Sequence, residues 1–437
     1  MTAPRATTLT RWLPALAAVV ALLPLLWFAK DLRDLFWFGD EWDQLDQISK
    51  MGFWRWTLWC FGENFAPVLK LSWGGLAAAS GGSYFFMVAA VWVVHAVCVL
   101  LLGRWLLRAG FSAFAAAVVL AGFALSYSNL ETLGWTIQLI TIQGVLFFVA
   151  AANWHEARNP GNLWSASSVL LFALLVTLST FSFVRGALTG GSLAVATVVP
   201  LLVSRGSRPS WRSRIPVLAA CLIPAAISVA VIMIFAPGNH HHVAGSGLKA
   251  PALFAAAYFL LNPLFKLATD GDLWTTGQFV ACAAVKIAVL VFGWLKATPS
   301  QRRLLLTVLV FDLGNAALMG IGRYNEPVVT ATSSRYQYFG LLCTLPFLAI
   351  ALEALLHPLA FAPRWRAAAA SIVLLLLTYA VTWGWRRDVP SWVDNRGRET
   401  RNLVFRDPHP PAEGAIPGIP FLTTARAKEI AAQYHLH

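Results

Sequence analysis

The sequence predicts an all-α protein, a polytopic transmembrane bundle of about eleven spans with interfacial helices on its outer face. Hydrophobic residues make up 58% of the chain and charged residues only 12%, whereas a soluble domain carries roughly a quarter charged residues. Apolar runs of about 17–25 residues recur along the chain, which is the length needed to cross ~30 Å of hydrocarbon. No class of soluble domain fits this composition.

The net charge of +13 does not indicate a nucleic-acid partner. The basic residues stand in short clusters between apolar runs, where topology determinants of membrane proteins belong. Twenty tryptophans suit a chain with many membrane–water boundaries. The five cysteines show neither metal-ligand spacing nor a disulfide pattern. We therefore expect membrane lipids, and no nucleic acid, among the partners.

The expected spans follow the apolar runs in order. They are residues 12–29, 84–103, 111–128, 135–152, 164–183, 186–204, 215–236, 279–295, 304–322, 336–356 and 367–385. The first run contains an interior proline and no small-residue cleavage site before the polar stretch. It is therefore interpreted as a retained helix, with a cleaved signal sequence as the alternative.

The loops support this topology. With the N-terminus inside, alternate loops should be cytoplasmic and rich in lysine and arginine. Each of them is, from the 104–108 turn to the 364–366 turn. The apolar segment 251–268 is short and contains Pro263, and counting it as a span would put later basic clusters outside. We expect it to be re-entrant or interfacial on the outer face, with twelve spans as the alternative.

This topology divides the chain into a transmembrane domain, residues 1–387, and a short outer tail, residues 388–437. The outer side of the first domain then carries the acidic loop 30–83 and the re-entrant or interfacial segment 237–278. The cytoplasmic loops are short and merely basic. Any active site should therefore face the periplasm or the cell exterior.

The first outer loop packs four carboxylates among aromatic residues. The stretch FWFGDEWDQLDQI contains Asp40, Glu41, Asp43 and Asp46 beside Phe36, Trp37, Phe38 and Trp42. Carboxylates beside aromatic side chains can have raised pKa values and serve as a general base or as metal ligands. The alternative is a solvated loop with interfacial aromatic anchors. Four carboxylates within seven positions, in a chain with only 20 acidic residues, favour a function.

Arginines near the outer boundary form a second group of candidates. Arg323 and Arg335 flank Glu326 and a hydroxyl-rich stretch in GIGRYNEPVVTATSSRYQYFG. Two guanidinium groups with hydroxyl donors suit phosphate or pyrophosphate recognition; a solvated loop with an internal Arg–Glu pair is the alternative. Arg185, between the fifth and sixth spans, could grip a lipid-linked phosphate or act as a snorkelling interfacial anchor.

Two outer features carry weaker signals. Glu131 sits at an outer helix end and could line a cavity. His240, His241 and His242 follow the seventh span, and three adjacent histidines cannot all reach one tetrahedral metal. A substrate-contacting loop fits them as well as a metal site does.

Polar residues inside the spans need partners, because unpaired polar groups are costly in lipid. Lys286 and Asp312 fall near the middle of sequential antiparallel spans and could meet at similar depth. A structural ion pair is the main interpretation, and a proton relay is the alternative. His95 is expected to be a hydrogen-bonded bundle residue. Gln138 and Gln143 are expected to face the bundle interior.

With Asp40 and Glu41 placed in the first outer loop, the chain resembles the C-type (GT-C) glycosyltransferase superfamily. It is similar to uncharacterised bacterial members with Gly-Asp-Asp/Glu in the first loop and, later, Glu-Asn-x-x-Trp-x-x-Gln and Ser-Arg-Tyr. The corresponding positions are Gly39-Asp40-Glu41, loosely Asn129 through Gln138, and Ser334-Arg335-Tyr336. The chain departs from the pattern at 63–70, where a His/Glu/Arg-rich segment is common, and it lacks a large soluble C-terminal domain. Both departures leave the acceptor class open.

The resemblance implies a multi-pass transferase of the bacterial inner (cytoplasmic) membrane, with its N-terminus cytoplasmic and a role in cell-envelope polysaccharide biosynthesis. Its donor would be a sugar on a polyprenyl phosphate, and its acceptor an envelope glycan or lipid. Asp40 would be the general base, and Glu41 its partner or a metal ligand; members vary in their need for a divalent cation such as Mg²⁺ or Mn²⁺. The substrate and phosphate contacts would be Arg323, Arg335, Tyr336, Arg185, Glu131 and His240.

Two other functions remain open. An O-antigen-type polymerase or ligase would share an outer arginine-rich site, but its main catalytic loop would come late in the chain. A lipid-linked glycan transporter or flippase would place essential charges mid-membrane, at Lys286, Asp312 and His95. Charged residues with no evident partner lie mostly in the outer loops, which favours the transferase.

Overall fold

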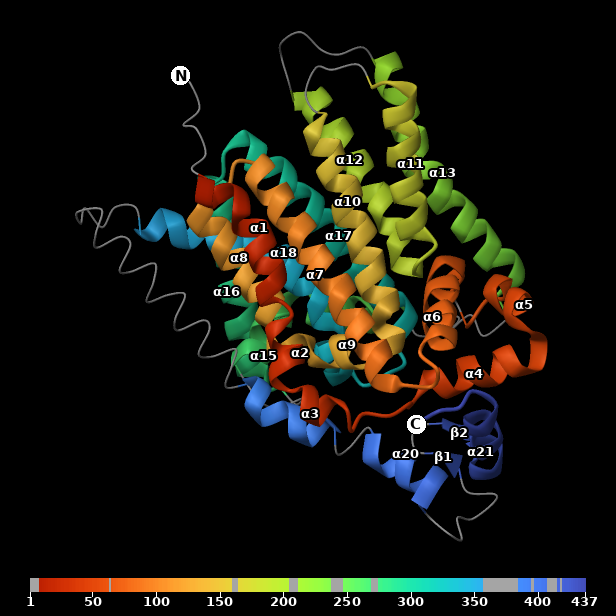
Figure 1. The fold of residues 1–437 in the computed structure, drawn as a ribbon. Helices are drawn as coiled ribbons and strands as arrows, with labels where there is room; N and C mark the ends of the chain where they lie inside the picture. Colours follow the sequence, from red (N-terminus) through yellow and green to blue (C-terminus); the bar gives the residue numbers. More distant parts are fainter. Residues whose placement is uncertain are drawn as a thin grey trace.

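The computed structural model is a helical bundle (Figure 1). It describes residues 8–62, 64–158, 164–203, 211–236, 247–268, 274–356, 384–393, 397–406, 415–416 and 419–437. Within these ranges the only sheet is a small antiparallel pair, β1 (Ala415–Ile416) and β2 (Ile419–Thr423). The expected all-α class is therefore confirmed for the described part of the chain.

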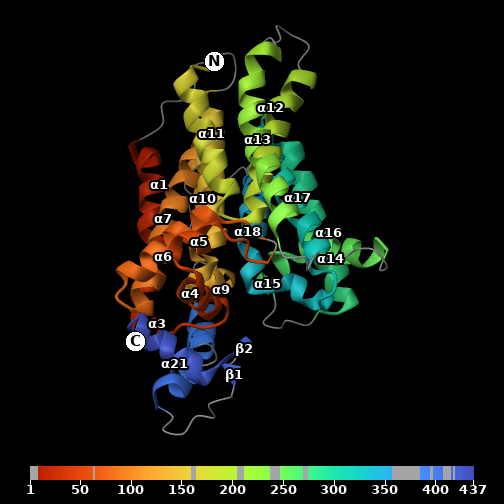
Figure 2. The same ribbon diagram turned by 90° about the vertical axis from the view of Figure 1, so that its right-hand side faces the viewer.

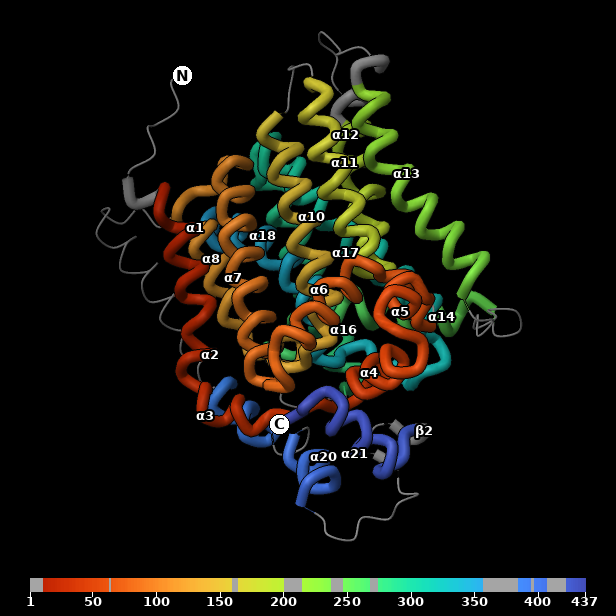
Figure 3. The backbone as a smooth tube through the Cα atoms, turned by 45° about the vertical axis from the view of Figure 1, so that its right-hand side comes forward, coloured from red at the N-terminus to blue at the C-terminus, as the bar shows by residue number. Residues whose placement is uncertain are grey.

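The long helices lie side by side and form the body of the molecule (Figures 1 and 3). They are α1 (Thr8–Val20), which the short helix α2 (Leu23–Trp27) follows, α7 (Tyr84–Arg108), α8 (Ala113–Leu125), α10 (Leu139–Ala157), α11 (Ala166–Thr180), α12 (Ala187–Val203), α13 (Trp211–Phe235), α16 (Thr276–Lys296), α17 (Pro299–Arg323) and α18 (Gln337–Leu356). Helices α13 and α16 keep many large apolar side chains exposed, among them Ile227, Met233 and Ile287. An apolar exterior of this kind suits contact with lipid.

Six helices in the described ranges are long and apolar enough to cross a membrane, and they coincide with six expected spans. They are Tyr84–Arg108, Thr136–Ala157, Arg214–Phe235, Thr276–Lys296, Pro299–Arg323 and Ser334–Leu356. A pair bent by 43°, Ala113–Leu125 with Tyr127–Gly134, raises the number to seven if it forms one span. These findings support a membrane protein with several transmembrane helices.

Shorter apolar helices occupy the places of three further expected spans. They are Arg11–Trp27, Ala166–Thr180 and Val184–Val199. The last expected span, 367–385, lies almost wholly outside the described residues. The total of eleven spans therefore stays a prediction.

The segment expected to be re-entrant or interfacial forms α14 (Lys249–Leu261) and α15 (Leu264–Ala268). The 13 residues of α14 extend about 20 Å at 1.5 Å per residue, less than the ~30 Å of a hydrocarbon core. This helix packs against α16 and α17. Its position relative to a membrane stays a prediction.

Short elements gather at the end of the bundle opposite the first residues of α1 (Figures 1 and 2). They are α3 (Ala29–Leu32), α4 (Asp40–Met51), α5 (Phe53–Leu58), α6 (Pro67–Ala79), α9 (Leu130–Gly134), α20 (Glu399–Arg401), the π-helical turn η7 (Asn402–Arg406) and α21 (Thr424–Gln433). Figure 3 shows α4, α5 and α6 following one another around this end, with α21 packed against α4. The acidic loop and the C-terminal segment thus share one end of the molecule.

The two mid-span charges of the bundle contact each other. Lys286 and Asp312 form a fully buried ion pair with 3.6 Å between Nζ and Oδ2, which confirms the expected pairing. The Lys286 ammonium also donates to the backbone oxygens of Phe259 and Asn262, at the C-terminal end of α14. A charge that holds an ion pair and caps a helix end supports the structural interpretation.

His95 and Gln143 likewise join neighbouring helices. The His95 ring bonds to the Tyr338 hydroxyl at 2.8 Å and to the Ala124 oxygen at 3.3 Å, which confirms it as a hydrogen-bonded bundle residue. Gln143 accepts a hydrogen bond from the hydroxyl of Ser72 at 2.8 Å, which connects α10 to α6. Both residues are buried.

Candidate active site

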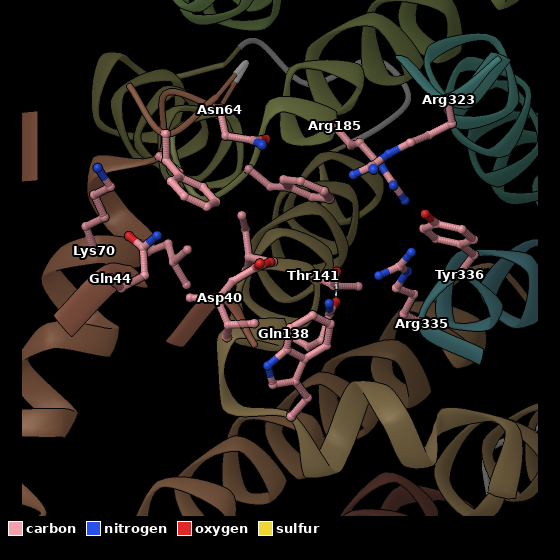
Figure 4. Close-up of a pocket in the computed structure, with 17 residues that line it drawn as sticks. Asp40, Gln44, Asn64, Lys70, Gln138, Thr141, Arg185, Arg323, Arg335 and Tyr336 are labelled. Carbon is pink, nitrogen blue, oxygen red and sulfur yellow. Dashed lines mark hydrogen bonds between the residues drawn. The ribbon is translucent and has the colours of Figure 1, made fainter. Parts of the chain in front are cut away.

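A cavity of about 800 Å³, counting the space open at its mouth, lies where the short elements meet the bundle (Figure 4). Its walls come from α4, the 61–70 segment, the start of α10, and three single-turn helices, η2 (Thr136–Gln138), η3 (Val184–Gly186) and η5 (Ser334–Tyr336), together with the end of α17. Its polar lining residues are Asp40, Gln44, Asn64, Lys70, Gln138, Thr141, Arg185, Arg323, Arg335 and Tyr336. The first outer loop and the outer arginines therefore reach one cavity.

The turn before α4 places Asp40 at this cavity. Gly39 precedes the helix with a φ of 58°, a value that glycine adopts without steric cost. A Cβ at this position would stand 3.1 Å from the ring of Trp135. The ring of Phe38 stacks on Trp135, with 5.2 Å between the centroids. The Gly-Asp-Glu motif is thus held against a cavity wall by close aromatic packing.

Asp40 has the environment of a general base. Its carboxylate makes no hydrogen bond to any described residue. Asp40 is exposed toward the cavity; desolvation by the surrounding cavity walls still raises its pKa, and the positive charges of Arg335 and Arg323 act in the opposite direction. A carboxylate with no structural partner, facing a cavity and adjusted by two cations, is suited to accept a proton from a bound hydroxyl.

Glu41, the next residue, points away from the cavity and is fully buried. Its carboxylate accepts hydrogen bonds from the Tyr84 hydroxyl, the Thr136 hydroxyl and the backbone amides of Phe38 and Ile137. Burial raises the pKa of Glu41 to about 8, although these hydrogen bonds oppose the shift. These contacts indicate a positioning residue, and the expected role of Glu41 as metal ligand or partner of the base stays a prediction.

The other two loop carboxylates also hold the fold together. Asp46 binds Lys50 on its own helix at 2.5 Å and Arg426 of α21 at 2.9 Å. Asp43 accepts a hydrogen bond from Gln47 at 3.4 Å. Neither carboxylate lines the cavity. Of the four loop acids, Asp40 alone is available there.

Four residues line the cavity across from Asp40 (Figure 4) and are called the cationic wall: Arg185, Arg323, Arg335 and Tyr336. Arg185 is buried, with its guanidinium over the rings of Phe183 and Tyr336, and it donates to the sulfur of Met319 at 2.8 Å. Nε of Arg335 and the hydroxyl of Tyr336 are buried with no hydrogen-bond partner in the described part of the chain.

This wall carries positive charge that the described residues neutralise only in part. Arg323 pairs with Glu326 at 2.6 Å. Within the described ranges, no carboxylate lies within ion-pair distance of Arg185 or Arg335. A buried cation without a counter-ion is costly, so the wall is suited to bind an anion such as a phosphate.

Glu131 supports the cationic wall from behind. Its Oε2 accepts a hydrogen bond from the backbone amide of Arg335 at 3.1 Å, and it does not line the cavity. Glu131, predicted to contact the substrate, thus contacts the backbone of a cavity residue, Arg335. His240 lies outside the described residues, so its predicted role stays untested.

The possible need for a divalent cation stays a prediction. Among the described residues, no three His, Cys, Asp or Glu side chains stand close enough together to hold a metal ion. Asp40 is the one carboxylate among the described lining residues. A Mg²⁺ or Mn²⁺ site normally uses one or two carboxylates together with substrate phosphates. The positive charge of this cavity comes from arginines.

The sequence did not predict the wall opposite the arginines, formed by Gln44, Asn64 and Lys70 (Figure 4). The Lys70 ammonium donates to the backbone oxygens of Trp56 at 2.7 Å and Trp59 at 2.6 Å. Burial lowers the pKa of Lys70 to about 8. The signal that could have found it is a lone lysine within the otherwise apolar run PVLKLSW.

The chain matches no protein-family model, and no curated protein is similar to it in sequence. Its function is inferred from the geometry of this cavity.

Proposed function

We propose that the protein is a membrane glycosyltransferase of the GT-C type, which transfers a sugar from a polyprenyl-phosphate donor to an envelope glycan or lipid. The observation that carries the proposal is the shared cavity: Asp40 faces Arg185, Arg323 and Arg335 across it. A general base next to a cationic wall is what transfer from a glycosyl phosphate requires.

The reaction is a single displacement at the anomeric carbon. The donor phosphate binds the arginine wall, and the acceptor hydroxyl lies next to Asp40. Asp40 takes the hydroxyl proton as the acceptor oxygen bonds to the anomeric carbon. The bond from that carbon to the phosphate oxygen breaks, and its electron pair leaves with the lipid phosphate. The guanidinium groups stabilise the charge that develops there.

The two rival functions are less well supported. A transporter would need mobile charges mid-membrane, but Lys286, Asp312 and His95 are all engaged in buried structural contacts. A polymerase or ligase would use the arginine wall without depending on Asp40. We place the protein in a bacterial inner membrane, with this cavity on the periplasmic or outer side.

The test is turnover of defined donors. Purified protein in lipid nanodiscs is incubated with a panel of polyprenyl-phosphate hexoses and an envelope-glycan fraction, and release of lipid phosphate is followed. We expect release by the wild type and a loss of about 10²–10⁴-fold in Asp40→Asn. Asp31→Asn, on α3 away from the cavity, is the matched control.

The outcomes separate the candidates. Full activity of Asp40→Asn together with loss in Arg335→Ala would favour the polymerase or ligase. Absence of turnover with every donor, with a wild-type phenotype of Asp40→Asn cells, would rule out the enzyme.

A further inference from the structure

The wall opposite the arginines contains polar groups that no described residue satisfies. Gln44 is only 2% exposed, and its Nε2 is buried without a hydrogen-bond partner among the described residues. The Oδ1 of Asn64 is also buried without a hydrogen-bond partner among these residues. A buried polar atom without a partner costs about 1–3 kcal/mol. Two such atoms on one cavity wall point to a ligand that supplies the missing bonds.

The orientation of Gln44 is set by its neighbour. Nε1 of Trp56 donates to Oε1 of Gln44 at 3.0 Å, and an indole nitrogen can only donate. The amide oxygen must therefore face Trp56, so the NH₂ group is left for the cavity. Figure 4 shows Gln44 to the left of Asp40, Asn64 above Asp40 and Arg335 to its right.

The backbone holds Asn64 in place. Phe61 and Asn64 exchange two backbone hydrogen bonds, at 3.0 Å and 2.9 Å, across a tight turn. The rings of Phe61 and Trp135 also line the cavity. The wall therefore combines a fixed amide donor, an amide acceptor and two aromatic rings.

This combination fits one chemical class. A sugar ring presents hydroxyl groups that both donate and accept, and its C–H faces pack on aromatic rings. The only cation on this wall, among the described lining residues, is Lys70, and its ammonium is turned to the oxygens of Trp56 and Trp59. A charged acceptor would find its counter-charge on the arginine side.

We infer that Gln44 and Asn64 form the acceptor subsite, and that the acceptor is an uncharged carbohydrate hydroxyl group held between these amides. The inference rests on the proposed function. It assigns the arginine wall to the donor phosphate and the amide wall to the acceptor, with Asp40 between them.

The experiment is a binding measurement that does not require turnover. Saturation-transfer NMR is recorded on the purified protein with methyl glycosides of glucose, galactose, mannose and N-acetylglucosamine, and with methyl glucuronide and methyl galacturonide. We expect signal from a neutral glycoside and about tenfold weaker binding in Gln44→Leu. Gln47→Leu is the matched control, because it makes the same change on α4 outside the cavity.

Every other result overturns the inference. Preference for the uronides, unchanged neutral binding in Gln44→Leu, or no signal from any glycoside would each do so. The proposed function is judged separately by release of lipid phosphate. Glycoside binding without donor turnover would contradict the proposed function but support the acceptor subsite. Donor turnover without glycoside binding would support the function and contradict the subsite.

Discussion

The backbone amide of Arg335 donates a hydrogen bond to the carboxylate of Glu131, with 3.1 Å between the nitrogen and the oxygen. This contact ties η5, which carries two residues of the cationic wall, to α9, which precedes the cavity residue Trp135. Glu131 is thus a positioning residue for the wall.

We expect Glu131→Ala to lower kcat/KM for the polyprenyl-phosphate donor about fivefold to tenfold, because the loop loses the hydrogen bond that holds its amide. The effect should fall mainly on the KM for the donor. Glu131→Gln should restore most of the activity, since its amide oxygen can still accept the bond. A loss as large in Glu131→Gln as in Glu131→Ala would instead indicate a role for the negative charge.

The pH profile should report the charges around Asp40. The base is active when deprotonated, and Arg323 stabilises that anionic form. Removing the positive charge in Arg323→Gln should raise the pKa of Asp40 and move the acidic limb of kcat/KM to higher pH. Arg323→Lys keeps the charge and should leave the limb in place. An unmoved limb in Arg323→Gln would mean that another group titrates.

Glu41 should make stability depend on pH. Its pKa rises from 4.5 to about 8 on folding because burial disfavours the anion. The folded state therefore binds more protons between these values, so stability should fall as pH rises from about 4.5 to about 8. Glu41→Gln cannot titrate, and its melting temperature in nanodiscs should change less across this range. Parallel curves for the two proteins would contradict the assignment.

Glu41→Gln should also lower the melting temperature at low pH. The carboxyl group receives donors on both oxygens, from Tyr84, Thr136 and Ile137 on one and from Phe38 on the other. An amide NH₂ facing the Phe38 amide brings two donors together, which costs about 1–3 kcal/mol. Asp31→Asn, the same kind of acid-to-amide change on α3 away from the cavity, is the matched control.

The buried pair should behave as a structural element. Lys286→Met leaves Asp312 charged and unpaired, and we expect a loss of about 3–5 kcal/mol of stability. The double variant Lys286→Met/Asp312→Leu should recover much of that loss and keep transferase activity. Thermal unfolding and lipid-phosphate release measure the two properties. Loss of activity in a stable double variant would revive the proton-relay interpretation.

Much of the fold could be predicted because a segment in the hydrocarbon core of a membrane must satisfy its backbone hydrogen bonds within itself. A run such as 84–103 must form a helix to satisfy its own backbone in lipid, whatever surrounds it. The same reasoning paired Lys286 with Asp312, since adjacent antiparallel helices bring mid-span residues to one depth. The 249–268 segment was harder, because a run of 13 helical residues is too short for periodicity to decide its position.

The site was predicted only in part. The carboxylates and arginines were identified because they cluster in the sequence, but the role of each one depends on the direction in which its side chain points. Asp40 and Glu41 are neighbours on one helix, so their side chains point about 100° apart. One faces the cavity and the other is sealed among Tyr84 and Thr136. The dipeptide Asp-Glu alone does not show which of the two side chains faces the cavity.

By itself the sequence determined the helical membrane class, most of the described helices and the two chemical groups of the site, because those depend on apolar length and on residue type. Only the tertiary structure decided which acid faces the cavity, which arginines have no counter-ion among the described residues, and that Gln44 and Asn64 line the same cavity. The reason is physical: hydrogen-bond satisfaction and burial depend on partners that stand far away in the chain.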